Sequence, residues 1–438
     1  MQLDFFPLRD KLGAKKANGA ANRLDSSDRA FHDWYRFVLS FPPHLVREYI
    51  NKFGLSGKNI ILDPFCGTGT TLVEAKHVGI SGIGFEPNSM AYFASSVKLD
   101  WDIDPDALMA HASSVAESAL GILAAQNGIA SRTLPPEAFK LLLKDSISPS
   151  PLHKSLVLLD QLQLLRNDEF FRHELLALAK TLVFSASNLH FGPEVGVHPI
   201  KKRDAPVVED WLAEVNSIAS DIRSVEKDIG PQAVVHFADS REPGKFLKPQ
   251  SIDAVFTSPP YPNEKDYTRT TRLESVILGF IRNKAELQAI KKGLIRSNTR
   301  NVYKGDDDDV WISNHKNIQE IAETIEKKRI ELGKTSGFER LYSKVTRLYF
   351  GGMARHLAAL RPILKPGAYL GYVVGDQASY LQVMIRTGQL LADIAQSLGY
   401  ELVSIDLFRT RLATATRKQM REEVVVLRWP ENKRLKKQ

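Results

Sequence analysis

Residues 59–88, "NIILDPFCGTGTTLVEAKHVGISGIGFEPN", contain the pattern that decides the fold. A short β-branched run ends at Asp63 and breaks into a turn that holds Gly67 and Gly69. A helical run follows the turn, and a second apolar run ends at Glu86. Strand, glycine-rich turn, helix and strand in this order are typical of a doubly wound sheet. The sequence therefore predicts an α/β fold: a Rossmann-like, doubly wound, mostly parallel sheet.

The glycine turn and Glu86 together indicate a ligand site. Glycines allow a tight turn and let a ligand approach the backbone, and the N–H groups at a helix start attract polar or anionic atoms. A carboxylate at the end of the second strand can accept both hydroxyls of a ribose. The spacing is neither GxGxxG nor the P-loop GxxxxGK[ST]. We therefore expect a nucleoside-bearing cofactor without a triphosphate; the alternative is a structural turn beside a solvated glutamate.

A second stretch, "SIDAVFTSPPY" (251–261), reads as a buried strand that ends in two prolines. Proline has no backbone donor and a fixed φ, so Pro259 and Pro260 cannot continue a central strand. Such a turn holds the neighbouring Ser258 and Tyr261 in fixed directions. The alternative is a proline-rich turn that only ends the strand.

"DPFCGTGTT" (63–71) and "TSPPY" (257–261), taken together, resemble the motifs of the amino-group DNA methyltransferases, which use S-adenosylmethionine. The resemblance covers about 31–95, 233–267 and 365–430. It implies that the first motif binds the cofactor and the second is catalytic. The cofactor-binding residues that it implies are Phe41, Asp63, Phe65, Gly67, Gly69, Thr70, Glu86 and Asp239.

Several of these residues have specific expected roles. Asp239 is expected to face the adenine amine of the cofactor, and Phe65 and Asp63 to line its methionine end. Asp63 can instead be a helix-capping group. Phe41 belongs to "FHDWYRFVLSFPPHLVREYI" (31–50), which resembles the family's additional cofactor motif; Trp34 and Tyr35 in the same stretch are expected to be core residues.

The resemblance assigns catalysis to Ser258, Pro259, Pro260 and Tyr261. Acceptors aimed at the two hydrogens of an exocyclic amine localise its lone pair and stabilise the charge that develops on nitrogen. The Ser258 hydroxyl and the Pro259 carbonyl are such acceptors, and Tyr261 can stack on a flipped base. A serine at this position favours cytosine N4 over adenine N6. RNA methylation and a non-catalytic nucleic-acid-binding protein are the alternatives.

Composition agrees with a nucleic-acid partner. The chain has 438 residues, a formal net charge of +8 and a single cysteine, Cys66, which excludes an intrachain disulfide. No stretch of about 18 consecutive apolar residues is present and the start lacks a signal peptide, so we expect a cytoplasmic protein. The acidic run 306–309 is expected to be a solvated loop, and no metal is expected. The expected partners are duplex DNA, a cognate restriction endonuclease and a second copy in a homodimer.

Large helical insertions interrupt the sheet pattern. We divide the chain into a poorly ordered lead-in (1–30), core (31–95), a helical insertion for target recognition or dimerisation (96–232), core (233–264), a second helical insertion with DNA contacts (265–364), core (365–430) and a basic tail (431–438). The stretch Phe191–Arg203 is expected to be either a basic loop that reaches the duplex or a plain inter-helix loop. The candidate DNA-binding cations are Lys201, Lys202, Arg203, Lys265, Arg269 and Arg272.

Overall fold

The structure is a computed structural model that describes residues 24–36, 40–126, 131–191, 194–225, 232–263, 265–412 and 419–431. Parts of several predictions lie outside these residues, among them most of the lead-in (1–23), residues 37–39 of the stretch 31–50, two residues of the basic loop (192–193) and the tail beyond 431. The described end of the lead-in is held against the core, because Asp28 accepts hydrogen bonds of 2.8 and 3.0 Å from Arg47.

In the described chain a mixed sheet of seven strands forms the centre, in the order β5-β2-β1-β6-β7-β9-β8. The strands β5, β2, β1, β6 and β7 run parallel, and β9 runs antiparallel to both β7 and β8. This topology confirms the predicted doubly wound, mostly parallel sheet. The strand bounds are β1 (Ile60–Asp63), β2 (Ser81–Phe85), β5 (Ala233–His236), β6 (Ile252–Thr257), β7 (Leu364–Gly375), β8 (Glu401–Leu412) and β9 (Gln419–Arg428).

Alternate residues of the central strands face opposite helical layers, as the period of two in a strand requires. Ile61 and Ala254 pack in one apolar cluster with residues of helix α1 (Pro43–Lys52). Their neighbours Leu62 and Val255 pack in another cluster, with residues of α13 (Tyr342–Leu360). All four side chains are fully buried. Both faces of the sheet are therefore covered, which explains why its strands read as continuous apolar runs.

Helix α1 begins at Pro43, because the first position of a helix does not need the N–H that proline lacks. Gly54, with φ of 65°, follows its end in the left-handed region. The other helices of the α/β core are α2 (Thr70–His77), α3 (Ser89–Lys98) and α14 (Thr387–Ser397).

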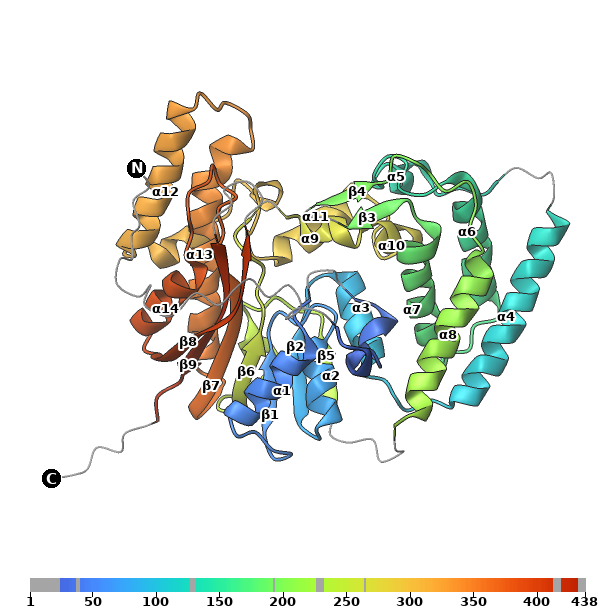
Figure 1. The fold of residues 1–438 in the computed structure, drawn as a ribbon, viewed down its shortest axis with the longest axis horizontal. Helices are drawn as coiled ribbons and strands as arrows, with labels where there is room; N and C mark the ends of the chain where they lie inside the picture. Colours follow the sequence, from blue (N-terminus) through green and yellow to red (C-terminus); the bar gives the residue numbers. More distant parts are fainter. Residues whose placement is uncertain are drawn as a thin grey trace.

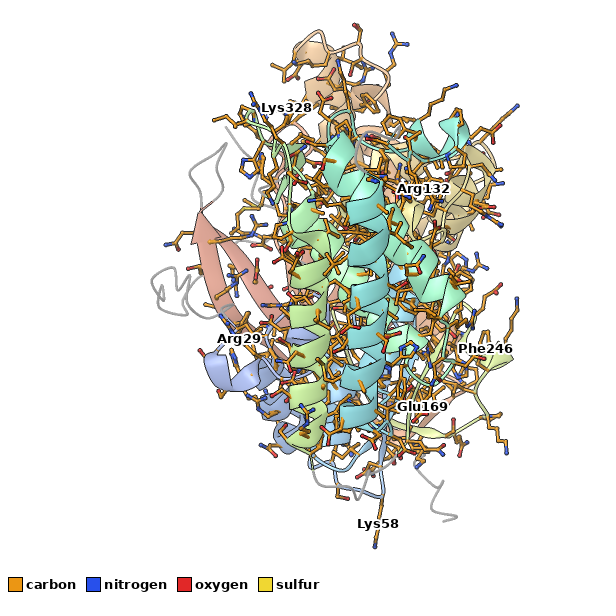
Figure 2. The ribbon with its side chains drawn as sticks, turned by 90° about the vertical axis from the view of Figure 1, so that its right-hand side faces the viewer. Arg29, Lys58, Arg132, Glu169, Phe246 and Lys328 are labelled. Atoms are coloured by element: carbon orange, nitrogen blue, oxygen red, sulfur yellow. The ribbon has the colours of Figure 1, made fainter. Side chains whose placement is uncertain are left out.

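The first insertion is helical, as expected, and stands beside α3 (Figure 1). Its helices are α4 (Pro105–Ala125), α5 (Pro136–Phe139), α6 (Pro149–Leu164), α7 (Phe171–Thr181), the π-helix η4 (Leu182–Ala186) and α8 (Val207–Arg223). Figure 2 shows α4 and α8 side by side on its outer surface. By length and mean hydropathy α4 is long and apolar enough to cross a membrane, although polar residues interrupt its apolar sequence. Its buried face packs against α6 and α8.

This insertion contains a β-hairpin that the sequence did not predict. Strand β3 (Leu189–Phe191) leads into the stretch Phe191–Arg203 that we expected to be a loop, and it pairs antiparallel with β4 (Val195–Val197) inside that stretch. Both strands are only three residues long, which is too short for period-two alternation to stand out.

The second insertion is also helical, with α9 (Tyr267–Thr270), α10 (Arg272–Ile277), α11 (Lys284–Gly293), the 3-10 helix η7 (Asp308–Ile312), α12 (Lys316–Glu331) and α13. The prediction that 306–309 is a solvated loop is wrong for Asp306 and Asp308, although Asp307 is exposed. The side chain of Asp308 is only 6% exposed and pairs with Arg241 at 2.5 Å and Arg355 at 3.1 Å. Asp306 pairs with Arg296 at 2.9 Å. These carboxylates are buried because arginines from several elements surround them.

Candidate active site

A cavity of about 610 Å³ opens at the carboxyl edge of the sheet, above β1 and β6. Strand order changes direction beside β1, and ligands of open α/β sheets bind at this kind of switch point. The lining combines the glycine turn after β1, the end of β2, the residue Ser240 after β5 and the proline turn after β6. Residues from both insertions and from β8 and β9 complete its walls.

The glycine turn has the geometry that requires glycine. Gly67 and Gly69 have φ of 51° and 86°, in the left-handed region, and Gly69 is the N-cap of α2. A Cβ on Gly69 would lie 3.1 Å from the Cβ of Ser95, so a larger residue would also collide with α3. Thr68 and Thr70 line the cavity beside Gly67, whereas Gly69 lies behind them.

Glu86 is fixed at the cavity wall by the turn itself. Its carboxylate accepts hydrogen bonds from the backbone N–H groups of Gly67, at 2.9 Å, and Asn88, at 2.8 Å. Burial raises the pKa of Glu86 to about 7, although these two hydrogen bonds act in the opposite direction. Each carboxylate oxygen can accept more than one hydrogen bond, so Glu86 keeps acceptor capacity for a ligand.

Asp63 lies between the ends of β1 and β6. Its Oδ1 accepts hydrogen bonds from the hydroxyl of Thr257, at 2.6 Å, and from the N–H of Phe65, at 3.2 Å. Burial raises the pKa of Asp63 to about 6. The structure does not place Asp63 at the start of α2, whose N-cap is Gly69 without a side-chain hydrogen bond. It also lies behind the cavity lining, so it joins the cofactor turn to the strand of the proline motif.

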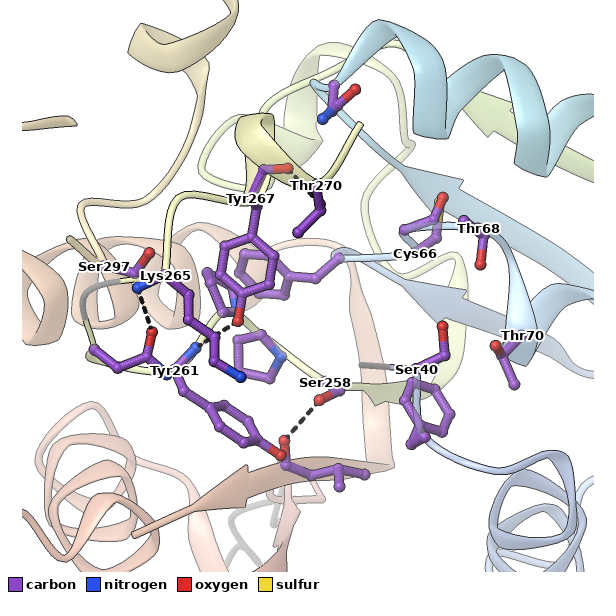
Figure 3. A pocket seen from close by; sticks show the side chains of 18 of the residues that line it. Ser40, Cys66, Thr68, Thr70, Ser258, Tyr261, Lys265, Tyr267, Thr270 and Ser297 are labelled. Atoms are coloured by element: carbon purple, nitrogen blue, oxygen red, sulfur yellow. Dashed lines mark hydrogen bonds between the residues drawn. The ribbon is translucent and has the colours of Figure 1, made fainter. Parts of the chain in front are cut away.

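The proline motif forms the wall opposite the glycine turn, and Ser258, Pro259, Pro260 and Tyr261 all line the cavity. Ser258 donates its hydroxyl hydrogen to the carbonyl of Val373, at 3.1 Å, as Figure 3 shows. Because that hydrogen points away, the lone pairs of the Ser258 oxygen are available to accept from a substrate.

Tyr261 is held from two sides. Its N–H donates to the phenol oxygen of Tyr267 at 3.3 Å, and its carbonyl accepts from the N–H of Asn263 at 2.8 Å. Its ring lies against the backbone of β7, since a Cβ on Gly375 would be 3.0 Å from the ring atom Cε2. Burial raises the pKa of Tyr261, so the phenol is neutral near pH 7.

Two phenylalanines predicted for the cofactor, Phe41 and Phe65, line the cavity. Phe41 packs edge-on against Phe256 of β6, with ring centroids 5.9 Å apart. As expected, Trp34 is a core residue, and its indole N–H donates to Asp221 at 2.8 Å. Tyr35 is also a buried core residue, as expected, and in addition it contributes to the cavity wall.

Asp239, like Asp63 and Gly69, is a predicted cofactor residue that does not line the cavity. Its carboxylate accepts hydrogen bonds from the guanidinium of Arg241, at 2.5 to 3.1 Å, while its neighbour Ser240 lines the cavity. The arginine lies two residues along the chain in "ADSRE" (238–242), and this proximity explains the different position.

The predicted DNA-binding cations fall into two groups. Lys265 lines the cavity, and burial lowers its pKa. Arg269 and Arg272 lie behind it on α9 and α10, where Arg272 donates to the carbonyl and hydroxyl of Thr268 at 3.1 and 2.8 Å. The second group, Lys201, Lys202 and Arg203, follows β4 outside the cavity, and the last two are exposed.

Sequence reasoning missed a charged cluster on the cavity wall. Glu422 of β9 pairs with Arg409 at 2.6 Å and Arg411 at 3.2 Å, both on β8. The signal was present in "FRTRL" (408–412), because residues two apart on a strand share a face. Other lining residues that the sequence did not single out are Asn88, Glu194, Ser297 and Gln377.

The switch-point cavity, with a glycine turn on one wall and a proline motif on the other, defines the class of a Rossmann-like methyltransferase. A family model described as DNA methylase, for N6 and N4 methyltransferases, matches residues 15–95. Over these residues the chain is similar to the amino-group (N4-cytosine/N6-adenine) DNA methyltransferases.

Similar proteins carry the same kind of description. Type II methyltransferase M.BsoBI of Geobacillus stearothermophilus is 26% identical over 450 aligned positions, which cover 92% of this chain and 85% of the relative. M.AvaI of Nostoc sp. is 26% identical over 195 positions, covering 41% of this chain and 38% of the relative. M.MjaII of Methanocaldococcus jannaschii is 38% identical over 68 positions, or 16% of this chain and 13% of the relative.

Proposed function

We propose that this DNA methyltransferase transfers a methyl group from S-adenosylmethionine to the exocyclic N4 amine of a cytosine flipped out of duplex DNA. The observation that carries the proposal is the position of Ser258, Pro259, Pro260 and Tyr261 on the cavity wall across from the glycine turn. Adenine N6 is the alternative target, and RNA is the alternative substrate.

The residues around the glycine turn fit this cofactor. The hydroxyl of Thr68 is buried on the cavity wall and has no hydrogen-bond partner among the described residues. We infer that Glu86 accepts the ribose hydroxyls, that Phe41 and Phe65 contact the methionine part, and that Ser240 lies nearer the adenine than Asp239 does. When bound, S-adenosylmethionine supplies an electrophilic methyl group on a sulfonium. A side chain on Gly69 would press on Ser95 of α3 and shift the turn that faces this ligand.

The proline motif has the acceptors that an aromatic amine requires. Since Ser258 directs its own hydrogen to Val373, its oxygen can accept one amine hydrogen, and the Pro259 carbonyl can accept the other. These acceptors stabilise the positive charge that develops on the amine nitrogen before its proton leaves. Tyr261, fixed by Tyr267 and the β7 backbone, offers a rigid face for stacking the base. In this mechanism, the placement of the amine and the stabilisation of its developing charge supply the acceleration of methyl transfer.

The choice of cytosine rests on Ser258. A hydroxyl is a shorter and weaker acceptor than the carboxylate or amide that accompanies adenine N6 in most of the family. The relatives' names contain the words Type II methyltransferase, and they support a role in a restriction-modification system with a cognate endonuclease. Cytoplasmic location and a homodimer remain predictions.

The test is to incubate the protein with labelled S-adenosylmethionine and mixed-sequence duplex DNA, then to digest the DNA and identify the methylated nucleoside by mass. N4-methylcytosine is the expected product. N6-methyladenine would overturn the choice of base and keep the class. Label on RNA with none on DNA would overturn the DNA substrate.

Ser258→Ala tests the catalytic assignment. We expect methyl transfer to fall by about 100-fold or more, because removing one aligned polar group of this kind costs on the order of 10²–10³ in rate. Cofactor affinity, measured by calorimetry, is expected to stay unchanged. Ser379→Ala removes an exposed hydroxyl from the same cavity wall and is the matched control. Equal rates for the Ser258 variant and the wild type would overturn the assignment.

A further inference from the structure

The loop Pro199–Arg203, which follows β4, combines an apolar tip with positive charge. Ile200 is 88% exposed, the largest exposure of any large apolar residue in the described part of the chain. Lys201, Lys202 and Arg203 follow it directly. Water is an unfavourable environment for an isoleucine side chain, and an apolar tip beside cations is complementary to a nucleic acid, whose stacked bases lie between anionic phosphates.

The loop has a rigid base rather than a loose one. Both of its ends bond to the buried Asn188: the N–H of His198 donates to the Asn188 carbonyl, and the N–H of Lys202 donates to its side-chain oxygen, each at 2.8 Å. The side-chain NH₂ of Asn188 donates in turn to the Asp145 carbonyl at 3.0 Å and to the Ser148 hydroxyl at 3.1 Å. The protein therefore presents Ile200 from a fixed frame, which lowers the entropic cost of inserting it into a partner.

The loop also adjoins the active-site cavity. The ammonium of Lys202 donates to the carbonyl of Ser185 at 2.6 Å and approaches that of Phe184 at 3.4 Å. Phe184 lines the cavity, and so do Phe191 and Glu194 of the hairpin that leads into the loop. Figure 1 shows this hairpin, β3 and β4, beside α9 and α11, across from α12 and α13. A duplex that delivers a base into the cavity would therefore run close to this loop.

We propose that Ile200 is a wedge that enters the duplex beside the target base pair and occupies the space that the extruded base leaves. The proposal rests on the proposed function, since only a flipped base leaves such a gap. Lys201 and Arg203 contact the phosphates on either side and hold the loop in the groove. Ile200 is accordingly a positioning residue, and it has no contact with the reacting atoms.

The test compares Ile200→Ala with the wild type on short duplexes that carry the methylated site mapped in the assay above. One duplex is fully paired, and the other has the target base in a mismatch, which is already cheaper to extrude. We expect kcat/KM on the paired duplex to fall about tenfold, which corresponds to about 1.4 kcal/mol. On the mismatched duplex we expect the loss to stay below about threefold, because a mismatched base costs less free energy to extrude and depends less on Ile200.

Leu164→Ala is the matched control, because Leu164 belongs to the same insertion, is 74% exposed and ends α6 far from the loop. Its activity on both duplexes is expected to equal that of the wild type. Fluorescence of 2-aminopurine at the target position gives a second readout: Ile200→Ala should reduce the increase that accompanies extrusion.

Equal losses on the two duplexes would overturn the wedge, since they indicate a general DNA contact or a folding defect. Unchanged activity of Ile200→Ala on the paired duplex would overturn it as well. A wild-type protein that methylates neither duplex would overturn the proposed function, and the wedge with it.

Discussion

Glu86 connects pH to cofactor binding at the scale of a single residue. Burial raises the pKa of Glu86 to about 7, so below that pH the free protein holds a proton on this carboxyl group. The ionised carboxylate is the better acceptor for ribose hydroxyls, so binding requires that proton to leave. We expect the affinity for S-adenosylmethionine to rise with pH up to about 7, by up to about tenfold per unit, and then to level off. Calorimetry from about pH 5.5 to about 8.5 measures it.

Glu86→Gln distinguishes the contribution of Glu86 to this pH dependence from that of Asp63. Burial raises the pKa of Asp63 to about 6, so Asp63 titrates in a nearby range. The variant cannot ionise at position 86, so its affinity is expected to be about tenfold lower at pH 8 and to change little between about pH 6.5 and 8. Any remaining change near pH 6 then belongs to Asp63. A wild-type profile that the substitution leaves unaltered would contradict the assignment of Glu86 to the ribose.

At the scale of an element, Gly69 tests how the cofactor turn is built. Gly69→Ala places a side chain in the left-handed region, at φ of 86°, and 3.1 Å from the Cβ of Ser95. We expect a loss of about 2–3 kcal/mol in the free energy of unfolding, measured with urea, together with weaker cofactor binding. Gly79→Ala is the control, because its φ is 75° but nothing lies within 4 Å of the added Cβ.

The control is expected to lose only about 1 kcal/mol, the cost of the backbone conformation, and to bind the cofactor normally. The difference between the two variants then measures the contact of the turn with α3. Equal losses would show that the close approach to Ser95 has no energetic weight.

Elements were predictable where local pattern determines them. The strands at 60–63 and 252–257 and the helix that begins at Pro43 follow from apolar runs and from proline and glycine at their ends. The hairpin β3–β4 was not predictable because three-residue strands carry almost no periodic signal. That Asp239 points away from the cavity was not predictable for another reason. Its carboxylate pairs with Arg241, and the sequence does not specify the direction of that arginine side chain.

At the scale of the whole molecule, Asp308 joins the second insertion to the α/β core. Its buried carboxylate pairs with Arg241, which follows β5, and with Arg355 of α13. Asp308→Asn removes the counter-charge of Arg355 and leaves Arg241 paired with Asp239 alone, so we expect a loss of about 2 kcal/mol in the free energy of unfolding. Thermal or urea unfolding measures the loss.

Asp307→Asn is the adjacent control. Asp307 is exposed, so its substitution is expected to change stability by less than about 0.5 kcal/mol. If the two variants were equally stable, the ion pairs of Asp308 would make no net contribution to the joint between the insertion and the core.

The site as a whole was only partly predictable, because its walls come from segments far apart in the chain. Phe41, the residues Ser258–Tyr261 and part of the glycine turn line the cavity, whereas Asp63 and Gly69 lie behind it. Arg409 and Glu422, which are register partners on the consecutive strands β8 and β9, line it as well, and the order of the sheet, with β9 beside β7, brings this pair to the cavity. That order depends on tertiary packing, which the local pattern of each strand does not contain.

The pairing of β1 with β6 has a consequence for the time at which the enzyme can become active. Asp63 and its partner Thr257 are separated by 194 residues, so a ribosome needs on the order of 10–40 s to make the second strand after the first. During that interval the nascent chain holds a finished cofactor turn beside an unpaired apolar strand edge. The insertion α4–α8, which shares an apolar cluster with α2 and α3, is synthesised in the same interval and can fold against them. We infer that this helical bundle is the first large part of the protein to fold, before the catalytic centre can assemble.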